Sequence, residues 1–244
     1  MDPTLGVFVA VGFVAQLIDG ALGMAYGVSS TTFLLSAGVP PAMASAGVHT
    51  AEVFTTLVSG LAHWRLGNVR WLLVRRLAVP GVVGGALGAY VLSSVPADAM
   101  RPFVAAYLLL MGVTILLRAL RRIPEREVWG KLVPLGAVGG FLDALGGGGW
   151  GPIVTSTLVA RGNNPRFTVG SVNLTEFFVT AAEAATFFGL LGLVHWQVIV
   201  GLVVGGTLAA PLAAYVCRLL PTRALMVVVG LAIIALQIRT LLLP

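Results

Sequence analysis

The sequence predicts an all-α integral membrane protein of two inverted repeats, each a re-entrant hairpin plus three transmembrane helices. First, 58% of the residues are hydrophobic and only 10% are charged, whereas a soluble domain carries about 25% charged residues. Second, the apolar segments have lengths that suit crossing or half-crossing a bilayer. Third, the two halves of the chain repeat, and their corresponding loops differ in charge.

The long apolar segments are about 20 residues each, which at 1.5 Å per residue crosses a hydrocarbon core of about 30 Å. The predicted first repeat, residues 1–122, has a hairpin at 5–37 and helices at 42–62, 77–95 and 99–118. The predicted second repeat, residues 129–244, has a hairpin at 132–160 and helices at 167–190, 197–217 and 224–243. The two repeats together form a single transport domain.

The two hairpins are predicted from apolar segments that are interrupted in the middle. The interruptions read DGALGMAYG, from Asp19, and DALGGGGWGP, from Asp143. Each glycine costs a helix about 1 kcal/mol relative to alanine. The flanking arms of 8 to 14 residues reach about 12–21 Å at 1.5 Å per residue, or half a membrane. We therefore expect each segment to enter the membrane and return on the same side.

The internal repeat is visible at an offset of about 124 positions. The matched residues are glycines, prolines and acids rather than interchangeable leucines. They include the pairs Asp19 and Asp143, Gly27 and Gly151, Thr31 and Thr155, Pro41 and Pro165, and Glu52 and Glu176. Such self-similarity indicates two structurally equivalent units.

The loop charges favour inversion of the second unit. Segment 63–76 holds four arginines and its counterpart 188–197 holds none, whereas 162–166 carries Arg166 and its counterpart 38–42 has no charge. Under the positive-inside rule, corresponding loops then lie on opposite sides, and both termini lie outside. The alternative is a parallel four-plus-four arrangement, in which each broken segment crosses once. That arrangement makes the loop charges inconsistent.

Hairpins that enter from opposite faces are expected to meet near the membrane midplane, as in transporters with inverted repeats. The second arm of each hairpin then directs its helix N-terminus, with free amides and a positive dipole end, towards the membrane centre, where it can bind an anion. The predicted substrate-binding residues are Ser29, Ser30, Thr31, Thr32, His49, Gly148, Gly149, Trp150, Gly151, Thr155, Ser156 and Asn173. The alternative is structural: glycines for close helix packing, and hydroxyls bonded to their own helices.

Acidic residues at membrane depth are expensive and point to function. Glu52 and Glu176 lie within predicted membrane-spanning helices, where desolvation favours the protonated carboxyl. We expect them to couple transport to protons, with a structural hydrogen bond as the alternative. Asp19 and Asp143 are expected to structure the tips by accepting backbone N–H bonds. Glu183 is a weaker candidate, because the repeat places Ser59 opposite it.

Three stretches resemble the sulfite exporter TauE/SafE family: DGALGMAYGVSSTTFLL, GVHTAEVFTTLVSGLAHWRLGNVRW and DALGGGGWGPIVTSTLVARGNNPRFTVGSVNLTEFFVT. The resemblance covers essentially the whole chain. It implies transport of sulfur-containing anions across a bacterial inner membrane. The resemblance implies where the site lies, and it says less about the role of each residue. The residues concerned are Ser29 to Thr32, His49, Glu52, Gly147 to Gly151, Thr155, Ser156, Asn173 and Glu176.

The expected function is therefore a secondary transporter, an exporter of a small sulfur oxyanion such as sulfite, coupled to the proton gradient. The alternatives are an uptake permease for sulfonates such as sulfoacetate or another anion, and an anion channel. An enzyme is not expected, because the chain has no H-E-x-x-H or G-x-S-x-G motif and a single cysteine, Cys217. We expect no cofactor, no metal and no nucleic-acid partner, since the arginines lie in short loops. The sequence leaves open a homo-oligomer and a structural role.

Overall fold

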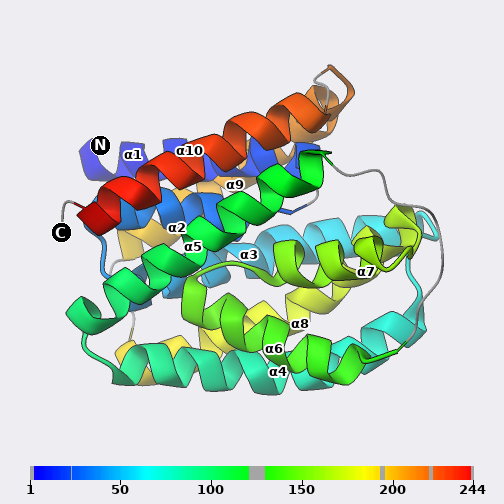
Figure 1. The fold of residues 1–244 in the computed structure, drawn as a ribbon, viewed down its shortest axis with the longest axis horizontal. Helices are drawn as coiled ribbons and strands as arrows, with labels where there is room; N and C mark the ends of the chain where they lie inside the picture. The colour runs from blue at the N-terminus through cyan, green and yellow to red at the C-terminus, as the bar shows by residue number, and fades with distance from the viewer. Residues whose placement is uncertain (1–2, 23, 121–129, 193–195, 220–221, 243–244) are drawn as a thin grey trace.

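Helices account for almost all of the part of the chain that the structure describes. This computed structural model describes residues 3–22, 24–120, 130–192, 196–219 and 222–242, and no strand occurs among them. The elements (Figure 1) are α1 (Pro3–Leu22), α2 (Tyr26–Ser36), α3 (Pro41–Arg65), α4 (Trp71–Ser94), α5 (Ala97–Leu120), α6 (Leu132–Gly146), the π-helical turn η1 (Gly151–Thr155), α7 (Ser156–Ala160), α8 (Pro165–Leu191), α9 (Trp196–Leu219) and α10 (Thr222–Leu242). The predicted all-α class is confirmed.

Two pairs of shorter helices lie where the hairpins are expected. α1 and α2 form one pair, and α6 with η1 and α7 forms the other. The second break falls at Gly147 and Gly148, whose φ angles are 71° and 140°. Side chains other than glycine rarely adopt this left-handed region, which explains why the glycines stand here.

Both first arms are longer than the expected 8 to 14 residues, since α1 has 20 residues and α6 has 15. α1 continues through Gly20 to Leu22, and α6 continues to Gly146. The cost of one or two glycines, about 1 kcal/mol each, is offset by packing, because α1 lies along α9 and α6 lies along α4. As a result, Asp19 and Asp143 sit near the helix ends, before the tips.

The helix pairs form a pattern that is symmetric between the two halves of the chain. The main pairs are α1 with α9, α6 with α4, α3 with α8, and α5 with α10. In the internal repeat α1 corresponds to α6, α3 to α8, α4 to α9 and α5 to α10. When each helix is replaced by its counterpart, the same four pairs result. Close helix contacts also repeat: Gly12 faces the backbone of Leu202, and Gly136 faces the backbone of Leu77. Equivalent helix pairs and contacts are what an approximate two-fold symmetry axis between the two halves would produce.

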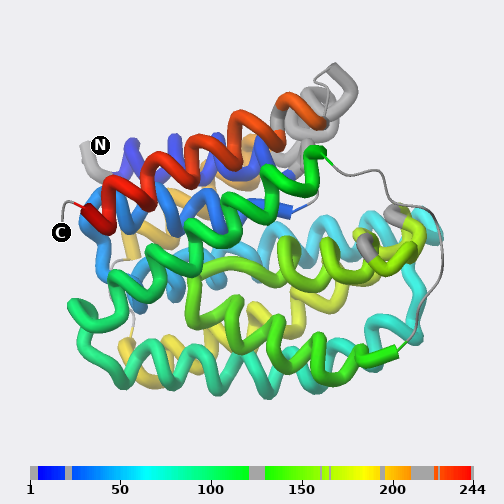
Figure 2. Tube along the Cα trace, viewed as in Figure 1, coloured from blue at the N-terminus to red at the C-terminus, as the bar shows by residue number. Residues whose placement is uncertain are grey.

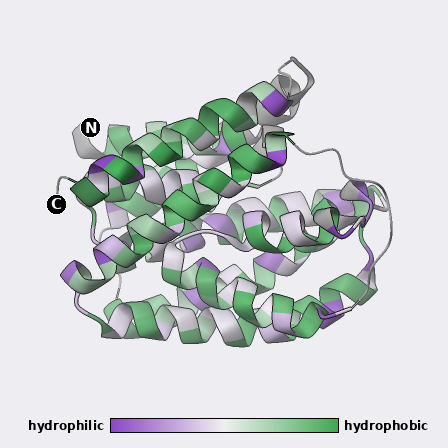
Figure 3. Ribbon diagram, viewed as in Figure 1, coloured by the Kyte–Doolittle hydropathy of each residue, from purple (hydrophilic) through white to green (hydrophobic). Residues whose placement is uncertain are grey.

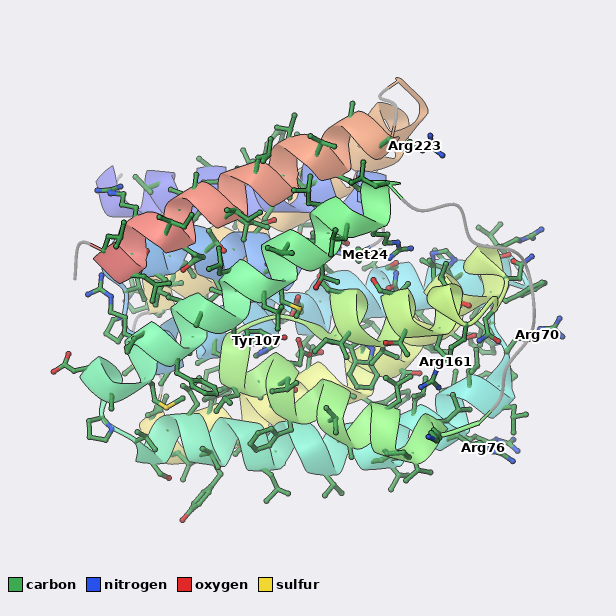
Figure 4. The ribbon with its side chains drawn as sticks, viewed as in Figure 1. Met24, Arg70, Arg76, Tyr107, Arg161 and Arg223 are labelled. Atoms are coloured by element: carbon green, nitrogen blue, oxygen red, sulfur yellow. The ribbon has the colours of Figure 1, made fainter. Side chains whose placement is uncertain are left out.

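The two hairpins open towards opposite ends of the bundle. Figure 1 marks both termini at one end, where α1 begins and α2 ends. The trace in Figure 2 shows α6 beginning and α7 ending at the other end. Labelled arginines Arg70, Arg76, Arg161 and Arg223 project at this second end in Figure 4.

Among the described residues, three helices are long and apolar enough to cross a membrane: α4, α5 and 166–191 of α8. α3 falls outside this group although it has 25 residues, because its buried face carries polar groups such as His49 and Glu52. Many large apolar side chains are exposed on the outside of the bundle, and hydrophobic residues predominate along α10 in Figure 3. Val79, for example, is 70% exposed, as expected of a side chain that faces lipid.

Candidate functional site

The two hairpin tips touch each other in the middle of the bundle. A Cβ built on Gly148 would lie 2.3 Å from the carbonyl carbon of Gly27, so the two backbones are in direct contact. The Thr31 hydroxyl donates a hydrogen bond to the carbonyl of Gly147. The side chains of Met24 and Tyr107 lie in this central region (Figure 4). The meeting of the tips is the geometry that the sequence predicts for a central site.

An aspartate from each first arm binds the start of the second arm. Asp19 Oδ1 accepts hydrogen bonds from the amides of Ala25, at 2.8 Å, and Tyr26, at 3.2 Å. Asp143 Oδ1 accepts one from the amide of Trp150, at 2.8 Å. Amides that were expected to face a bound anion are therefore held by the protein's own carboxyl groups.

Tyr26 and Trp150 occupy equivalent positions at the two tips. The Tyr26 hydroxyl donates to the carbonyl of Leu202 at 3.2 Å, and the Trp150 indole Nε1 donates to the carbonyl of Val172 at 3.3 Å. Both side chains are buried. Each ties its tip to a neighbouring long helix, and this fixes the tip relative to α9 or α8.

A cavity lies beside the tip contact, between α3 and α8. The centre of a water molecule can occupy about 30 Å³ of it, which is room for about two water molecules or one compact anion. Its lining residues are Gln16, Asp19, Met24, Ala25, Tyr26, Gly27, Val28, Glu52, Thr55, Thr56, Ser59, Gly149, Gly151, Pro152, Asn173 and Glu176. Both tips and both predicted coupling carboxyls thus border one space.

The predicted substrate-binding residues divide into two groups. Gly149, Gly151 and Asn173 line the cavity, and the Asn173 amide donates to Ser59 Oγ at 2.9 Å. The cavity lining does not include the others: Ser29, Ser30, Thr31, Thr32, His49, Gly148, Trp150, Thr155 and Ser156. Several of these lie directly behind the tips, where the hydroxyls of Ser29, Thr32 and Thr155 are buried without a hydrogen-bond partner among the described residues.

A second cluster of ionisable groups lies behind Glu52. His49 Nδ1 is 2.9 Å from Glu52 Oε2 and 3.1 Å from Glu183 Oε2. His49 Nε2 is 3.2 Å from the carbonyl oxygen of Asp143. Oxygen and nitrogen atoms of His49, Asp143 and Glu183 all lie within 4.8 Å of one another. This cluster joins α3, α6 and α8 at the base of the second tip.

The chain's relatives identify the class of protein to which this site belongs. A family model described as "Sulfite exporter TauE/SafE" matches residues 8–240. The chain belongs to this family. It is also similar to the "Probable membrane transporter protein YtnM" of Bacillus subtilis (strain 168), with 43% identity over 247 aligned positions that cover 96% of this chain and 82% of the relative. No solved structure matches the chain.

The resemblance to the TauE/SafE family is thereby confirmed, and the chain is a membrane transporter of that family. The family's description and the relative's name both refer to transport. The opposed tips, the cavity and the buried carboxyls are therefore the candidate transport site of a TauE/SafE protein.

Sequence reasoning gave too little weight to two residues of this TauE/SafE site. Glu183 is fully buried beside His49. An acidic residue within a predicted spanning helix already indicated a functional role, but Glu183 was ranked lower because its counterpart in the repeat is Ser59. Arg118 ends the predicted helix 99–118 and was given no role in the site, but it lies in the last turn of α5 and is half-buried. Its Nη1 donates to Ser156 Oγ at 3.0 Å and lies 2.6 Å from Met24 Sδ. It places a positive charge beside the cavity wall.

Proposed function

We propose that this TauE/SafE protein is a secondary transporter that exports a small sulfur oxyanion such as sulfite, coupled to the proton gradient. The proposal is carried by one observation: two opposed tips meet at a cavity lined by Glu52 and Glu176. Backbone at the tips supplies donors for an oxyanion, and the carboxyls supply sites for protons. Movement of one unit against the other around the tips would expose the cavity to each side in turn.

The carboxyls give a physical reason for coupling. Two negative charges 4 Å apart repel by about 4 kcal/mol at an effective dielectric constant of 20. An anion would therefore enter a cavity lined by Asp19, Glu52 and Glu176 most readily when these carboxyls are protonated. A protonated carboxyl also donates a hydrogen bond to an oxyanion. Proton and anion are thus expected to occupy the site together.

The aspartates at the tips strengthen this coupling. Asp19 and Asp143 hold the amides of Ala25, Tyr26 and Trp150. A substrate oxyanion would compete with these carboxylates for the same donors. Protonation weakens a carboxyl group as an acceptor, because charge-assisted hydrogen bonds are about twice as strong as neutral ones. Protonation of the tips therefore favours release of the amides to the substrate.

The proposed orientation has the arginine-bearing end of the bundle in the cytoplasm and both termini outside, in a bacterial inner membrane. The labelled arginines at one end (Figure 4) and the termini at the other (Figure 1) support this under the positive-inside rule. The hairpins that open to opposite ends, together with the symmetric helix pairs, support two inverted repeats.

Uptake of a sulfur anion or sulfonate is the second candidate, and the carboxyl-lined cavity favours it. An anion that travels with protons follows an inward proton gradient into the cell. Export of an anion with fewer protons than negative charges would instead be driven by the negative interior potential, which is worth about 2.3 kcal/mol per charge at 100 mV. The direction thus depends on the number of protons per anion.

Thermal unfolding of the purified protein with sulfite, sulfate, thiosulfate, taurine or sulfoacetate tests the binding step. A ligand at a hundred times its dissociation constant stabilises the protein by about 2.7 kcal/mol. We expect one small sulfur anion to raise the melting temperature, and more strongly at lower pH. Flux into proteoliposomes under imposed pH gradients then gives the direction. The proposal is wrong if none of the five compounds stabilises the protein or crosses the membrane.

A further inference from the structure

His49 is enclosed by acceptor groups from three helices. Its Nε2 faces the carbonyl oxygen of Asp143 on α6 at 3.2 Å. Its Nδ1 faces Glu52 Oε2 on α3 at 2.9 Å and Glu183 Oε2 on α8 at 3.1 Å. The ring is fully buried and stacks on Phe187 with an interplanar angle of 5°. The imidazole thus has hydrogen-bond partners at both nitrogens.

The partners determine where protons must be. A carbonyl oxygen only accepts, so Nε2 carries a hydrogen. In a neutral imidazole Nδ1 is then an acceptor, and an ionised carboxylate is also an acceptor. Two acceptors do not form a 2.9 Å contact without a proton between them. At least one proton is therefore shared between Nδ1 of His49 and the carboxyls of Glu52 and Glu183.

Glu183 has the environment of a neutral acid. Its side chain is 0% exposed, and neither oxygen has a hydrogen-bond partner among the described residues apart from the close approach to His49. A buried, unpaired carboxylate is strongly unfavourable. Besides His49 and Glu52, the described titratable groups that interact with Glu183 are Asp143 of α6, Glu176 of α8 and Tyr107 of α5. None of these three supplies a positive charge.

The fold makes room for this carboxyl. A Cβ on Gly85 of α4 would lie 2.5 Å from Glu183 Oε1, so a larger residue would displace the carboxyl. The cavity lining includes Glu52 but neither His49 nor Glu183. Glu52 therefore stands between the cavity and the His49 cluster, and its Oε2 points to His49.

We propose that His49 and Glu183 form a proton-binding site, separate from the anion cavity and loaded through Glu52. A proton on Glu52 Oε2 passes to His49 Nδ1, and the imidazolium passes it on to Glu183 Oε2, so that a proton moves and no other bond changes. The inference rests on the proposed function in one respect, that protons accompany the anion. The inference adds that one of these protons is held outside the cavity that binds the anion.

Infrared spectroscopy of the purified protein tests the site without any substrate. We expect a carboxylic-acid carbonyl band that disappears in Glu183→Gln and is unchanged in Asp98→Asn, which removes an exposed carboxyl at the start of α5. Unchanged acid bands in Glu183→Gln would show that Glu183 is ionised and would overturn the proposal. So would a metal ion that binds in stoichiometric amount and is lost in this variant.

Proton movement that accompanies sulfite flux across proteoliposomes, followed with an indicator dye in weak buffer, tests the link to transport. His49→Gln and Glu183→Gln should each lower the number of protons carried per sulfite by about one, whereas His63→Gln, at the end of α3, should not. If Glu183→Gln does not fold, the His49→Gln result decides. An unchanged proton count in His49→Gln contradicts the relay even where sulfite binds. If no anion binds, the proposed function is wrong. The infrared experiment still decides whether Glu183 holds a proton, because it needs no anion.

Discussion

The contact between the tips makes Gly27→Ala an informative substitution. In a helix interior, replacing glycine with alanine stabilises by about 1 kcal/mol. At Gly27, however, the new Cβ would lie 2.7 Å from Gly148 Cα and 2.9 Å from Glu52 Oε1. Carbon atoms normally approach to about 3.5–4.0 Å, so the tips must separate by about 1 Å. Overpacking of this kind costs about 1–3 kcal/mol.

We therefore expect Gly27→Ala to be less stable than the parent protein by up to about 2 kcal/mol, after the gain in helix propensity. Anion flux into proteoliposomes should fall at least about tenfold, because the donors at the tips move apart. Gly189→Ala is the matched control: it lies in α8, and no described atom is within 4 Å of its Cβ. It should be as stable as the parent or more stable, with unchanged flux. A Gly27→Ala protein that behaves like Gly189→Ala would refute the close contact of the tips.

Three further predictions follow from the site. Asp143→Ala leaves the buried Trp150 amide without its acceptor and should destabilise the protein by about 1–3 kcal/mol, measured by unfolding in detergent; equal stability would contradict the role of this carboxyl at the tip. Arg118→Gln removes the positive charge beside Ser156. It should weaken anion binding about tenfold, because one charge-assisted contact is worth about 1.5–3 kcal/mol. The control Arg239→Gln, at the exposed end of α10, should leave anion binding unchanged. Sulfite should stabilise the protein more strongly as the pH falls, because protonation removes repulsion between the anion and the cavity carboxyls. Glu52→Gln and Glu176→Gln should each make this stabilisation less dependent on pH. If sulfite stabilises the parent protein equally at every pH, proton coupling is contradicted.

The helices could be predicted closely because their signals are local. The apolar segments are separated by prolines, glycines and arginines, so the predicted ranges fall within a few residues of the observed ones for α3, α8 and α10. The ends of α1 and α6 were harder to predict. Gly20 and Gly146 interrupt a helical pattern locally, but packing against α9 and α4 extends the helices through them.

The candidate site was predicted in part. Glu52 and Glu176 were expected at a shared centre, and both border the cavity. The amides of the tips were expected to be free for a ligand, but Asp19 and Asp143 hold them. A carboxyl near a tip is visible in the sequence. Its distance from a particular amide depends on how far the preceding helix continues.

The amino-acid sequence by itself determined the membrane class, the broken segments and the repeat, because composition, segment length and the cost of glycine are properties of short stretches of chain. Only the tertiary structure decided that the His49 ring lies between Glu52, Glu183 and the carbonyl of Asp143, and that Arg118 contacts the first tip at Met24. Apart from Glu52, which follows His49 by three residues on the same helix, these partners are far apart in the chain. They are brought together by the packing of several helices, and no local pattern encodes which of their faces meet.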